Sequence, residues 1–232
     1  MIARDDVLRE LKLTPVWRLR QPATGQHDAD PADAARRARI AGLSFDALVD
    51  DVAACKACAL CRTRRNTVPG VGDREARWLF VGEAPGADED AQGEPFVGVA
   101  GQLLDNMLLA LGLDRSKDVF IANVLKCRPP ENRNPEPGEA LACAPYLDRQ
   151  VELIAPGVIV ALGRSAAGRL LDTDAAVASL RNRVHRHRGV PLIVTYHPAY
   201  LLRTPSDKGK VWEDLLFARR VLRDAAGATA QR

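Results

Sequence analysis

Cysteine spacing is the most distinctive chemical feature of this sequence of 232 residues. Three of its five cysteines lie in CKACALC, residues 55–61, and the other two are Cys127 and Cys143. A CxxC pair with a distant second pair is typical of a zinc site or of an iron–sulfur cluster, and spacing alone does not choose between them. A chain reversal across residues 128–140 would bring the distant pair together. We therefore expect a four-thiol site made by Cys55, Cys58, Cys127 and Cys143, with Cys61 as the spare thiol.

The cellular compartment decides how these thiols are used. The N-terminus, MIARDDVLRELKL, carries acidic residues and lacks the apolar core and small-residue cleavage site of a signal peptide. No apolar run approaches the ~18 residues that indicate a membrane-spanning helix. We therefore expect a cytoplasmic protein, in which thiols serve as metal ligands or reactive groups rather than as disulfides.

The segment GEAPGADEDAQGEPFVG, residues 82–98, combines a tight turn with several acidic side chains. It matches neither GxGxxG nor the P-loop, so it supports neither dinucleotide nor triphosphate binding. Its carboxylates, with Glu83 at the start, suit activation of a water molecule or stabilisation of positive charge, although a solvated acidic turn has the same composition. Phe96 lies outside any periodic core pattern and either stacks on a planar ligand or packs in the core.

Asn123 and His197 are polar residues at the ends of apolar segments. Asn123 interrupts IANVL, where it either satisfies its amide with a ligand at the mouth of a sheet or caps the following loop. His197 begins HPAYLLR, where a histidine can donate to an oxygen that carries negative charge. The apolar residues and the arginine that follow fit a wedge that enters a base stack, or the start of the last helix.

Apolar segments rich in β-branched residues alternate with helical segments and must position these loops. The expected strands span residues 77–82, 118–126, 157–163 and 191–198, and the expected helices span 101–113, 137–154, 165–171 and 211–222. This alternation predicts an α/β fold with three αβα layers around a central, mainly parallel four-stranded sheet. Open parallel sheets bind ligands outside the carboxyl ends of their strands. We therefore expect the loops that contain GEAPG, NVLKCRPP, GRS and YHPAYLLR to converge on one site.

Composition is that of a globular protein, with 47% hydrophobic and 27% charged residues and a net charge of only +3. Two basic groups, RNRVHRHR at residues 181–188 and the arginines at 62, 64 and 65, either bind phosphates or form solvated faces. Residues 21–38 are rich in Ala, Asp, Pro and Arg and predict a disordered linker. We expect one domain over residues 44–225, an N-terminal extension over 1–43 and a disordered tail over 226–232.

The motifs GEAPG, EPFVG, NVLKCRPPENRNP and HPAYLLR, in this order and downstream of a CxxC, resemble those of family 4 uracil-DNA glycosylases. The resemblance covers about residues 44–225. It implies a monofunctional DNA repair enzyme that flips uracil out of single- or double-stranded DNA and hydrolyses its N-glycosidic bond, leaving an abasic site. It also implies that the four-thiol site holds a structural [4Fe–4S] cluster, with Cys55, Cys58, Cys127 and Cys143 as ligands. GEAPG argues against the family 5 type, which lacks the polar residue of this motif.

The resemblance further implies a role for each loop residue. The implied catalytic residues are Glu83, Asn123 and His197, and the implied base-binding residues are Ala84, Glu89, Phe96 and Asn132. The residues implied to contact DNA are Tyr200, Leu201, Leu202 and Arg203. In these roles Asn123 reads the N3–H and O4 edge of uracil, Phe96 stacks on the base, and His197 stabilises charge on O2.

We expect a monomer in the bacterial cytosol or nucleoid, with no membrane association and a weak protein contact through residues 1–20. Two other classes of function carry different expectations. A metal-stabilised nucleic-acid-binding module would bind DNA without releasing a base. An iron–sulfur electron carrier would leave the loops with Glu83, Asn123 and His197 unexplained.

Overall fold

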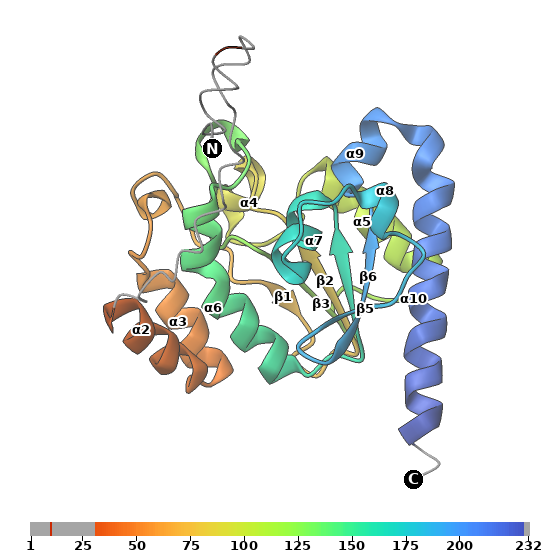
Figure 1. Ribbon diagram of the computed structural model, residues 1–232, viewed down its shortest axis with the longest axis horizontal. Helices are drawn as coiled ribbons and strands as arrows, with labels where there is room; N and C mark the ends of the chain where they lie inside the picture. Colours follow the sequence, from red (N-terminus) through yellow and green to blue (C-terminus); the bar gives the residue numbers. More distant parts are fainter. Residues whose placement is uncertain (1–9, 11–30, 230–232) are drawn as a thin grey trace. The chain divides into compact units, whose positions relative to one another are not determined.

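The computed structural model describes residue 10 and residues 31–229 (Figure 1). Contacts divide the chain into two units, residues 1–37 and residues 38–232. The segment expected to contact another protein, residues 1–20, lies outside the described residues except for residue 10. Residues 21–30 of the expected linker and 230–232 of the expected tail lie outside them as well.

The prediction of a disordered linker over residues 21–38 is wrong for its last part, because helix α2 spans Pro31–Ala41. This segment is rich in alanine and arginine, which favour helix. Arg37 Nε also donates a hydrogen bond of 2.7 Å to Asp33, one turn earlier in the same helix. At the other end of the chain, helix α10 spans Lys208–Thr229 and so continues into the segment expected as a disordered tail.

Parallel strands form the centre of the sheet, namely β2 (Trp78–Gly82), β3 (Val119–Asn123), β4 (Val158–Leu162) and β6 (Val190–Thr195). Every residue of β2, β3 and β4 is buried, as expected for near-continuous apolar runs covered on both faces. These strands confirm those that the sequence predicts.

The sheet is nevertheless larger than the predicted four strands. Within the described residues it has six strands in the order β1-β3-β2-β4-β6-β5, because short antiparallel strands extend both edges. These are β1 (Val71–Gly72) and β5 (His185–His187). One is two residues long and the other has the sequence HRH, so neither contains the apolar run that marks a central strand.

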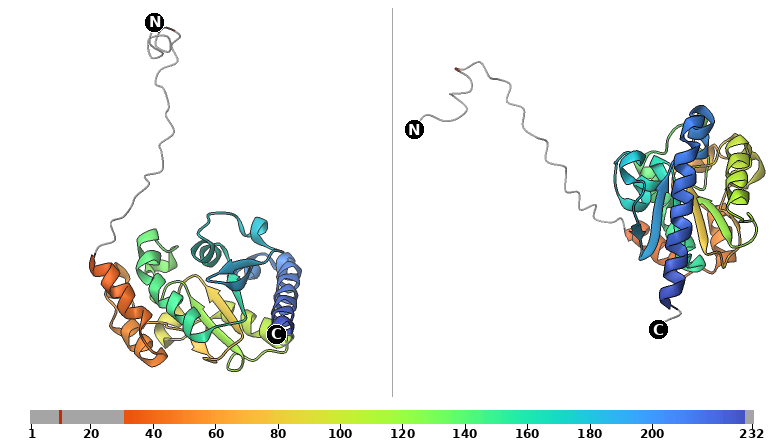
Figure 2. Two further views of the ribbon diagram at one scale, coloured as in Figure 1. Left: turned by 60° about the horizontal axis from the view of Figure 1, so that its bottom comes forward. Right: turned by 90° about the vertical axis from the view of Figure 1, so that its right-hand side faces the viewer.

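Helices cover both faces of this mixed sheet (Figure 2). One face packs against α6 (Pro137–Ile154), α7 (Arg164–Leu171) and α8 (Val177–Leu180). The opposite face packs against α5 (Val99–Ala110), α9 (Pro198–Arg203) and α10. The predicted three-layer arrangement is therefore confirmed. HPAYLLR forms its own short helix, α9, rather than the first turn of the last one.

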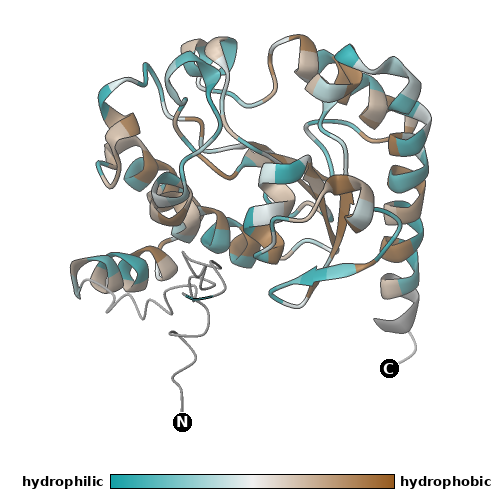
Figure 3. Cartoon of the chain, turned by 45° about the horizontal axis from the view of Figure 1, so that its top comes forward, coloured by the Kyte–Doolittle hydropathy of each residue, from teal (hydrophilic) through white to brown (hydrophobic). Residues whose placement is uncertain are grey.

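Hydropathy follows this layering. In Figure 3 hydrophobic colouring gathers on the central strands, whereas the helices alternate between hydrophobic and hydrophilic faces. Among the described residues, no helix is long and apolar enough to cross a membrane.

Short helices lie in the segments that connect the strands and the longer helices. Helix α3 (Phe45–Ala54) begins at Ser44, whose hydroxyl accepts a hydrogen bond from the Ala47 N–H at 3.4 Å, and its buried Leu48 and Val52 pack against Tyr146 of α6. The 3-10 helix η1 (Ala59–Arg62) follows it, so the CxxC lies between α3 and η1. The remaining short helices are α4 (Ala87–Gln92), η2 (Pro130–Asn132) and η3 (Pro205–Asp207).

The strand register brings the loops together. Gly82, the last residue of β2, lies opposite Asn123, the last residue of β3, and Leu162 at the end of β4 lies opposite Thr195 at the end of β6. Because these strands are parallel and end at similar levels, the loops after them share one edge of the sheet.

Candidate active site

A pocket of about 510 Å³ lies at this carboxyl edge of the sheet. The loops after β2, β3 and β6 line it with Glu83, Ala84, Glu89, Phe96, Asn123, Asn132, His197, Tyr200 and Arg203, among others. The first turn of α7, which follows β4, contributes indirectly, because Ser165 Oγ donates a hydrogen bond to Glu83. The structure therefore brings together every residue expected to be catalytic or to bind the base.

Asn123 is the polar residue most deeply placed in the pocket wall. Its side chain is almost fully buried, with the residue 2% exposed, and its Oδ1 atom has no hydrogen-bond partner among the described residues. Gly82 makes room for it, because a Cβ atom at position 82 would lie 2.4 Å from Asn123 Oδ1 and 2.6 Å from the Phe96 ring. A buried amide oxygen without a partner is costly, so this one is suited to accept a hydrogen bond from a ligand.

The Phe96 ring forms another part of the wall, and its backbone has a positive φ of 56°. Such a conformation is unusual for a bulky residue and persists only where the surroundings fix it. Arg115 donates hydrogen bonds to the carbonyls of Phe96, at 3.0 Å, and of Pro95. Gly101 permits this close packing, because a Cβ atom there would lie 1.8 Å from the Phe96 carbonyl oxygen. The chain therefore holds Phe96 in one strained position at the pocket.

His197 is held as a neutral hydrogen-bond donor. It caps the N-terminus of α9, and its Nδ1 atom accepts a hydrogen bond from the Ala199 N–H at 3.1 Å. The proton of the neutral imidazole is then on Nε2. The pKa of His197 is lowered to about 4, mainly by burial and also by the positive charge of Arg203, whereas the negative charge of Glu89 acts in the opposite direction. Its ring stacks on Phe96, with centroids 5.5 Å apart.

The acidic residues of the loop after β2 differ in what they contact. The Glu89 carboxylate accepts backbone hydrogen bonds from Gly86 at 3.0 Å, Val97 at 3.0 Å and Gly98 at 3.1 Å, so it braces the loop that carries Phe96. Asp90 is buried and accepts hydrogen bonds from the backbone of Arg65 and Asn66, so it joins this loop to the segment after the cysteines.

Glu83 is the other carboxylate of this loop that lines the pocket. Unlike Glu89, it accepts no hydrogen bond from a backbone N–H within the described residues. Its one hydrogen bond here comes from the Ser165 hydroxyl on α7. That bond fixes the direction of the carboxylate and leaves acceptor capacity for a water molecule.

The segment expected to contact DNA divides into buried and exposed residues. Leu201 is only 1% exposed and packs in the core against the sheet, so it offers almost no surface to DNA in this structure. Leu202 is 43% exposed. Tyr200 donates a hydrogen bond to Asp207 at 2.8 Å, and both Tyr200 and Arg203 line the pocket. The helical turn of α9 explains the difference, because adjacent residues of a helix face different directions.

Sequence reasoning missed several polar residues of the loop after β3. Arg133 and Asn134 line the pocket beside Asn132, and the Arg133 guanidinium forms a bidentate pair with Glu139 at 2.9 and 2.6 Å. Asn132 accepts a hydrogen bond from Arg128 at 2.7 Å. The motif CRPPENRNP contained the signal, since its polar residues all lie in one loop after a strand. Ser165 had no such signal, because its contact with Glu83 arises only in the folded chain.

All five cysteines line a second pocket, together with Arg64, Lys126 and Tyr146, among others. The expected approach of the CxxC to Cys127 and Cys143 is therefore confirmed, and Cys61 lies in the same place. Cys127 Sγ accepts a hydrogen bond from Arg64 at 3.0 Å, and Cys143 Sγ accepts one from the Lys126 N–H at 3.3 Å. Burial raises the pKa of the Cys143 thiol to about 12. In the part of the chain that the structure describes, no group of His, Cys, Asp or Glu residues is arranged to hold a metal ion.

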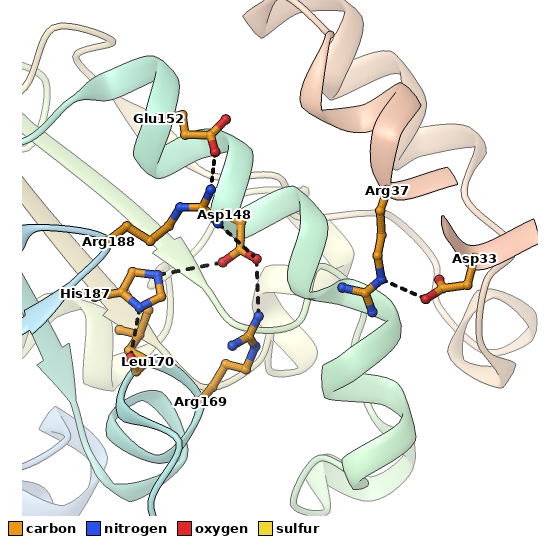
Figure 4. Close-up of polar contacts among 8 residues, drawn as sticks. All are labelled: Asp33, Arg37, Asp148, Glu152, Arg169, Leu170, His187 and Arg188. Atoms are coloured by element: carbon orange, nitrogen blue, oxygen red, sulfur yellow. Dashed lines mark hydrogen bonds and ion pairs between the residues drawn. The ribbon is translucent and has the colours of Figure 1, made fainter. Parts of the chain in front are cut away.

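The last two residues of the basic stripe at 181–188, His187 and Arg188, lie among acidic partners (Figure 4). His187 donates from Nδ1 to the Leu170 carbonyl at 2.8 Å and faces Asp148, while Arg188 pairs with Asp148 and Glu152. His187 lies opposite Val190, the first residue of β6, and so at the end of the sheet away from the pocket. This part of the stripe is therefore a charge-paired face, the simpler of the two readings of its composition.

The sequence of this chain is similar to those of known proteins. Residues 69–216 match the uracil DNA glycosylase superfamily. The chain is 48% identical over 170 residues to the type-4 uracil-DNA glycosylase of Archaeoglobus fulgidus. The aligned region covers 70% of this chain and 85% of that protein. It is 42% identical over 188 residues to the type-4 enzyme of Saccharolobus solfataricus, with 77% and 87% covered. It is 44% identical over 187 residues to that of Sulfurisphaera tokodaii, with 77% and 84% covered.

The pKa of His197 gives a testable pH dependence. Because it lies at about 4 in the folded chain and at 6.5 in the reference state, neutral His197 stabilises the fold fully above pH 6.5. This contribution, of the order of 3 kcal/mol, is lost as the pH falls from 6.5 to 4. We expect ¹⁵N NMR to show an Nε2–H tautomer that does not titrate above about pH 5. The free energy of unfolding of His197→Gln provides the control, because this variant should lose this part of the acid sensitivity. A His197 ring that titrates near pH 6.5 in the folded protein would contradict the assignment.

Proposed function

This chain belongs to the uracil DNA glycosylase superfamily, and we infer that it is a uracil-DNA glycosylase, a hydrolase of N-glycosyl bonds that acts in DNA repair. We propose that the pocket at the carboxyl edge of the sheet receives a uracil that has been flipped out of DNA. A base must leave the stack before its glycosidic bond is accessible, at a cost of a few kcal/mol.

The unpartnered Oδ1 atom of Asn123 is the observation that carries this proposal. Uracil presents the N3–H donor beside the O4 acceptor, so one fixed carboxamide can complement both groups. Cytosine presents an acceptor at N3 and a donor amino group, which mismatches the same orientation. Asn123 and Phe96 pack so closely against Gly82 that a Cβ atom there would strike both, and this packing keeps the amide in place. Phe96 stacks on the base in this proposal, and Ala84 and Asn132 line its surroundings.

His197 stabilises the leaving group. As the N1–C1′ bond breaks, uracil leaves as an anion with charge on O2. The neutral imidazole donates from Nε2, because Nδ1 is engaged by the Ala199 N–H. A preorganised donor of this kind contributes about 3–4 kcal/mol to the transition state. An imidazole with a pKa of about 4 stays neutral at physiological pH, so it acts by hydrogen bonding rather than as a cation.

Glu83 acts on the sugar side of the bond. The deoxyribose gains oxocarbenium character as the base leaves, as in glycoside hydrolysis. The carboxylate that Ser165 orients can offset this positive charge or direct a water molecule to C1′. Among the described residues that line the pocket there is no lysine to form a Schiff base, which supports simple hydrolysis without strand cleavage.

DNA contacts follow from the exposed residues around the pocket. We propose that Leu202, rather than the buried Leu201, enters the gap that the flipped base leaves. Arg203 and Tyr200 lie at the same rim, where a cation and a phenol can contact the backbone of single- or double-stranded DNA. We further propose that the protein acts as a monomer in the cytoplasm.

The donor set of the cysteine pocket fits a [4Fe–4S] cluster. All five thiols line this pocket, and the resemblance to family 4 uracil-DNA glycosylases favours a [4Fe–4S] cluster over zinc as its occupant. We propose Cys55, Cys58, Cys127 and Cys143 as the ligands. A bound cluster would supply cross-links between α3, the end of β3 and α6, and no chemistry at the base.

A DNA substrate with a single uracil tests the activity and the role of Asn123. After incubation and alkali, the wild-type protein should cut the strand at the uracil. Asn123→Ala should lower the excision rate by about 100-fold or more, because a buried hydrogen bond to the base is lost in the transition state. Gln102→Ala, an exposed change on α5, should leave the rate unchanged. Full activity in Asn123→Ala would contradict the proposed site.

Two cysteine variants separate ligand from spare thiol. Cys58→Ser should lower the iron content and visible absorbance and destabilise the fold, because a cluster bound to the native state stabilises it. Cys61→Ser should retain both. The measurement is iron and sulfide analysis beside thermal unfolding of purified protein. Retention of the cluster by Cys58→Ser with its loss from Cys61→Ser would reassign the ligands.

A further inference from the structure

We propose that Arg64 and Lys126 balance the charge of the cluster, and that Lys126 also couples the cluster to the position of Asn123. The inference rests on the proposed function, because it takes a [4Fe–4S] cluster as the occupant of the cysteine pocket. Lys126 thereby acts as a positioning residue for base recognition.

The first step concerns charge. An iron–sulfur core held by four thiolates is a net anion; Cys127 is buried and Cys143 is half-buried. A buried charge is costly unless opposite charges and hydrogen bonds compensate it. Two cationic side chains line the same pocket as the cysteines, Arg64 and Lys126. They are the natural counter-charges.

Arg64 is the cation that contacts a cysteine sulfur through its side chain. Its Nη1 donates to Cys127 Sγ at 3.0 Å, and its Nη2 donates to the Ala53 carbonyl at 2.8 Å at the end of α3. The second bond fixes the guanidinium, so its charge stays beside the sulfur. Hydrogen bonds to cluster sulfurs and local charge are the protein's means of setting a cluster's reduction potential.

Lys126 balances the charge of the proposed cluster from a buried position. The residue is 1% exposed, and its Nζ donates to the Asn123 carbonyl at 2.8 Å and to Gln150 Oε1 at 2.6 Å, which are both neutral. In the described part of the chain, no carboxylate forms an ion pair with this ammonium. The side chains of Cys127 and Cys143 line the same pocket as Lys126, and as ligands of a cluster they would carry negative charge. Its countercharge is therefore the cluster itself.

The same ammonium reaches the base-recognition residue. Asn123 is the last residue of β3, and the bond from Lys126 Nζ to its carbonyl fixes the backbone from which the carboxamide projects. Gln150 of α6 holds the other side of the ammonium and donates from Nε2 to the Pro69 carbonyl at 2.7 Å. The backbone N–H of Lys126 meanwhile donates to Cys143 Sγ. One residue thus contacts a proposed cluster ligand and the strand end that reads the base.

The coupling follows from this arrangement. Without the anionic cluster, the Lys126 ammonium is a buried charge with neutral partners, and its departure from the core releases the Asn123 carbonyl. Cluster occupancy and base recognition then favour each other through one side chain.

The test compares three variants of the holoenzyme by two readouts. Redox titration gives the midpoint potential of the cluster, and binding to a duplex with one 2′-fluoro-2′-deoxyuridine, which resists glycosidic cleavage, is measured relative to undamaged duplex. Lys126→Met should lower the midpoint potential, because a cation that favours the reduced cluster is lost, and should weaken uracil-specific binding by about tenfold or more. Arg64→Gln should lower the potential and leave uracil-specific binding unchanged. Lys117→Met, an exposed control, should change neither.

Each part of the proposal has a result that overturns it. A wild-type potential in Lys126→Met overturns the charge balance, and a lowered potential with wild-type uracil binding overturns the coupling. If Lys126→Met gives no folded holoenzyme, an unchanged potential in Arg64→Gln overturns the charge balance. Unchanged uracil binding in Gln150→Met, which removes an acceptor of the ammonium, then overturns the coupling. A wild-type protein that releases no uracil would overturn the proposed function alone, because the potentials are read without catalysis.

Discussion

The pocket depends on the absence of a side chain at position 82. The parallel register between β2 and β3 places Gly82 opposite Asn123, and the Phe96 ring lies against the same backbone. A side chain there would occupy the space in which the amide and the ring lie. Because of this constraint, strand pairing, which is set by the hydrophobic core, fixes the geometry of the residues proposed to recognise the base. The chemistry of the site is therefore a consequence of sheet register as much as of residue type.

Bracing groups hold the rest of the site around this point. The Glu89 carboxylate joins the two ends of the loop that carries Phe96, and Asp90 joins that loop to the segment after the cysteines. Residues that follow β3 also line the cysteine pocket, and one of them, Lys126, connects it to Asn123. The carboxylates of Glu89 and Asp90 therefore brace the loop around the pocket, whereas Glu83 is the carboxylate left to act on the sugar in the proposed mechanism. Such bracing is the usual requirement for electrostatic preorganisation.

The sequence predicted the central sheet, its helices and the pocket residues because these carry local signals. Long apolar runs marked β2, β3, β4 and β6, and polar residues at their ends marked the site. It did not predict β1 and β5, because strands of two and three residues at an edge need no apolar run. Nor did it separate Leu201 from Leu202, or Glu83 from Glu89. These differences arise from helix phase and from backbone contacts that only the folded loops create.

The space at position 82 gives the most direct measurement of the central claim. The excision rate of Gly82→Ala on single-uracil DNA should fall by about 100-fold or more, while binding to undamaged DNA and cluster content stay at wild-type values. The added methyl group would lie 2.4 Å from Asn123 Oδ1, so the amide and the Phe96 ring would have to move. A folded Gly82→Ala protein with the wild-type excision rate would contradict the claim that this close packing forms the uracil site.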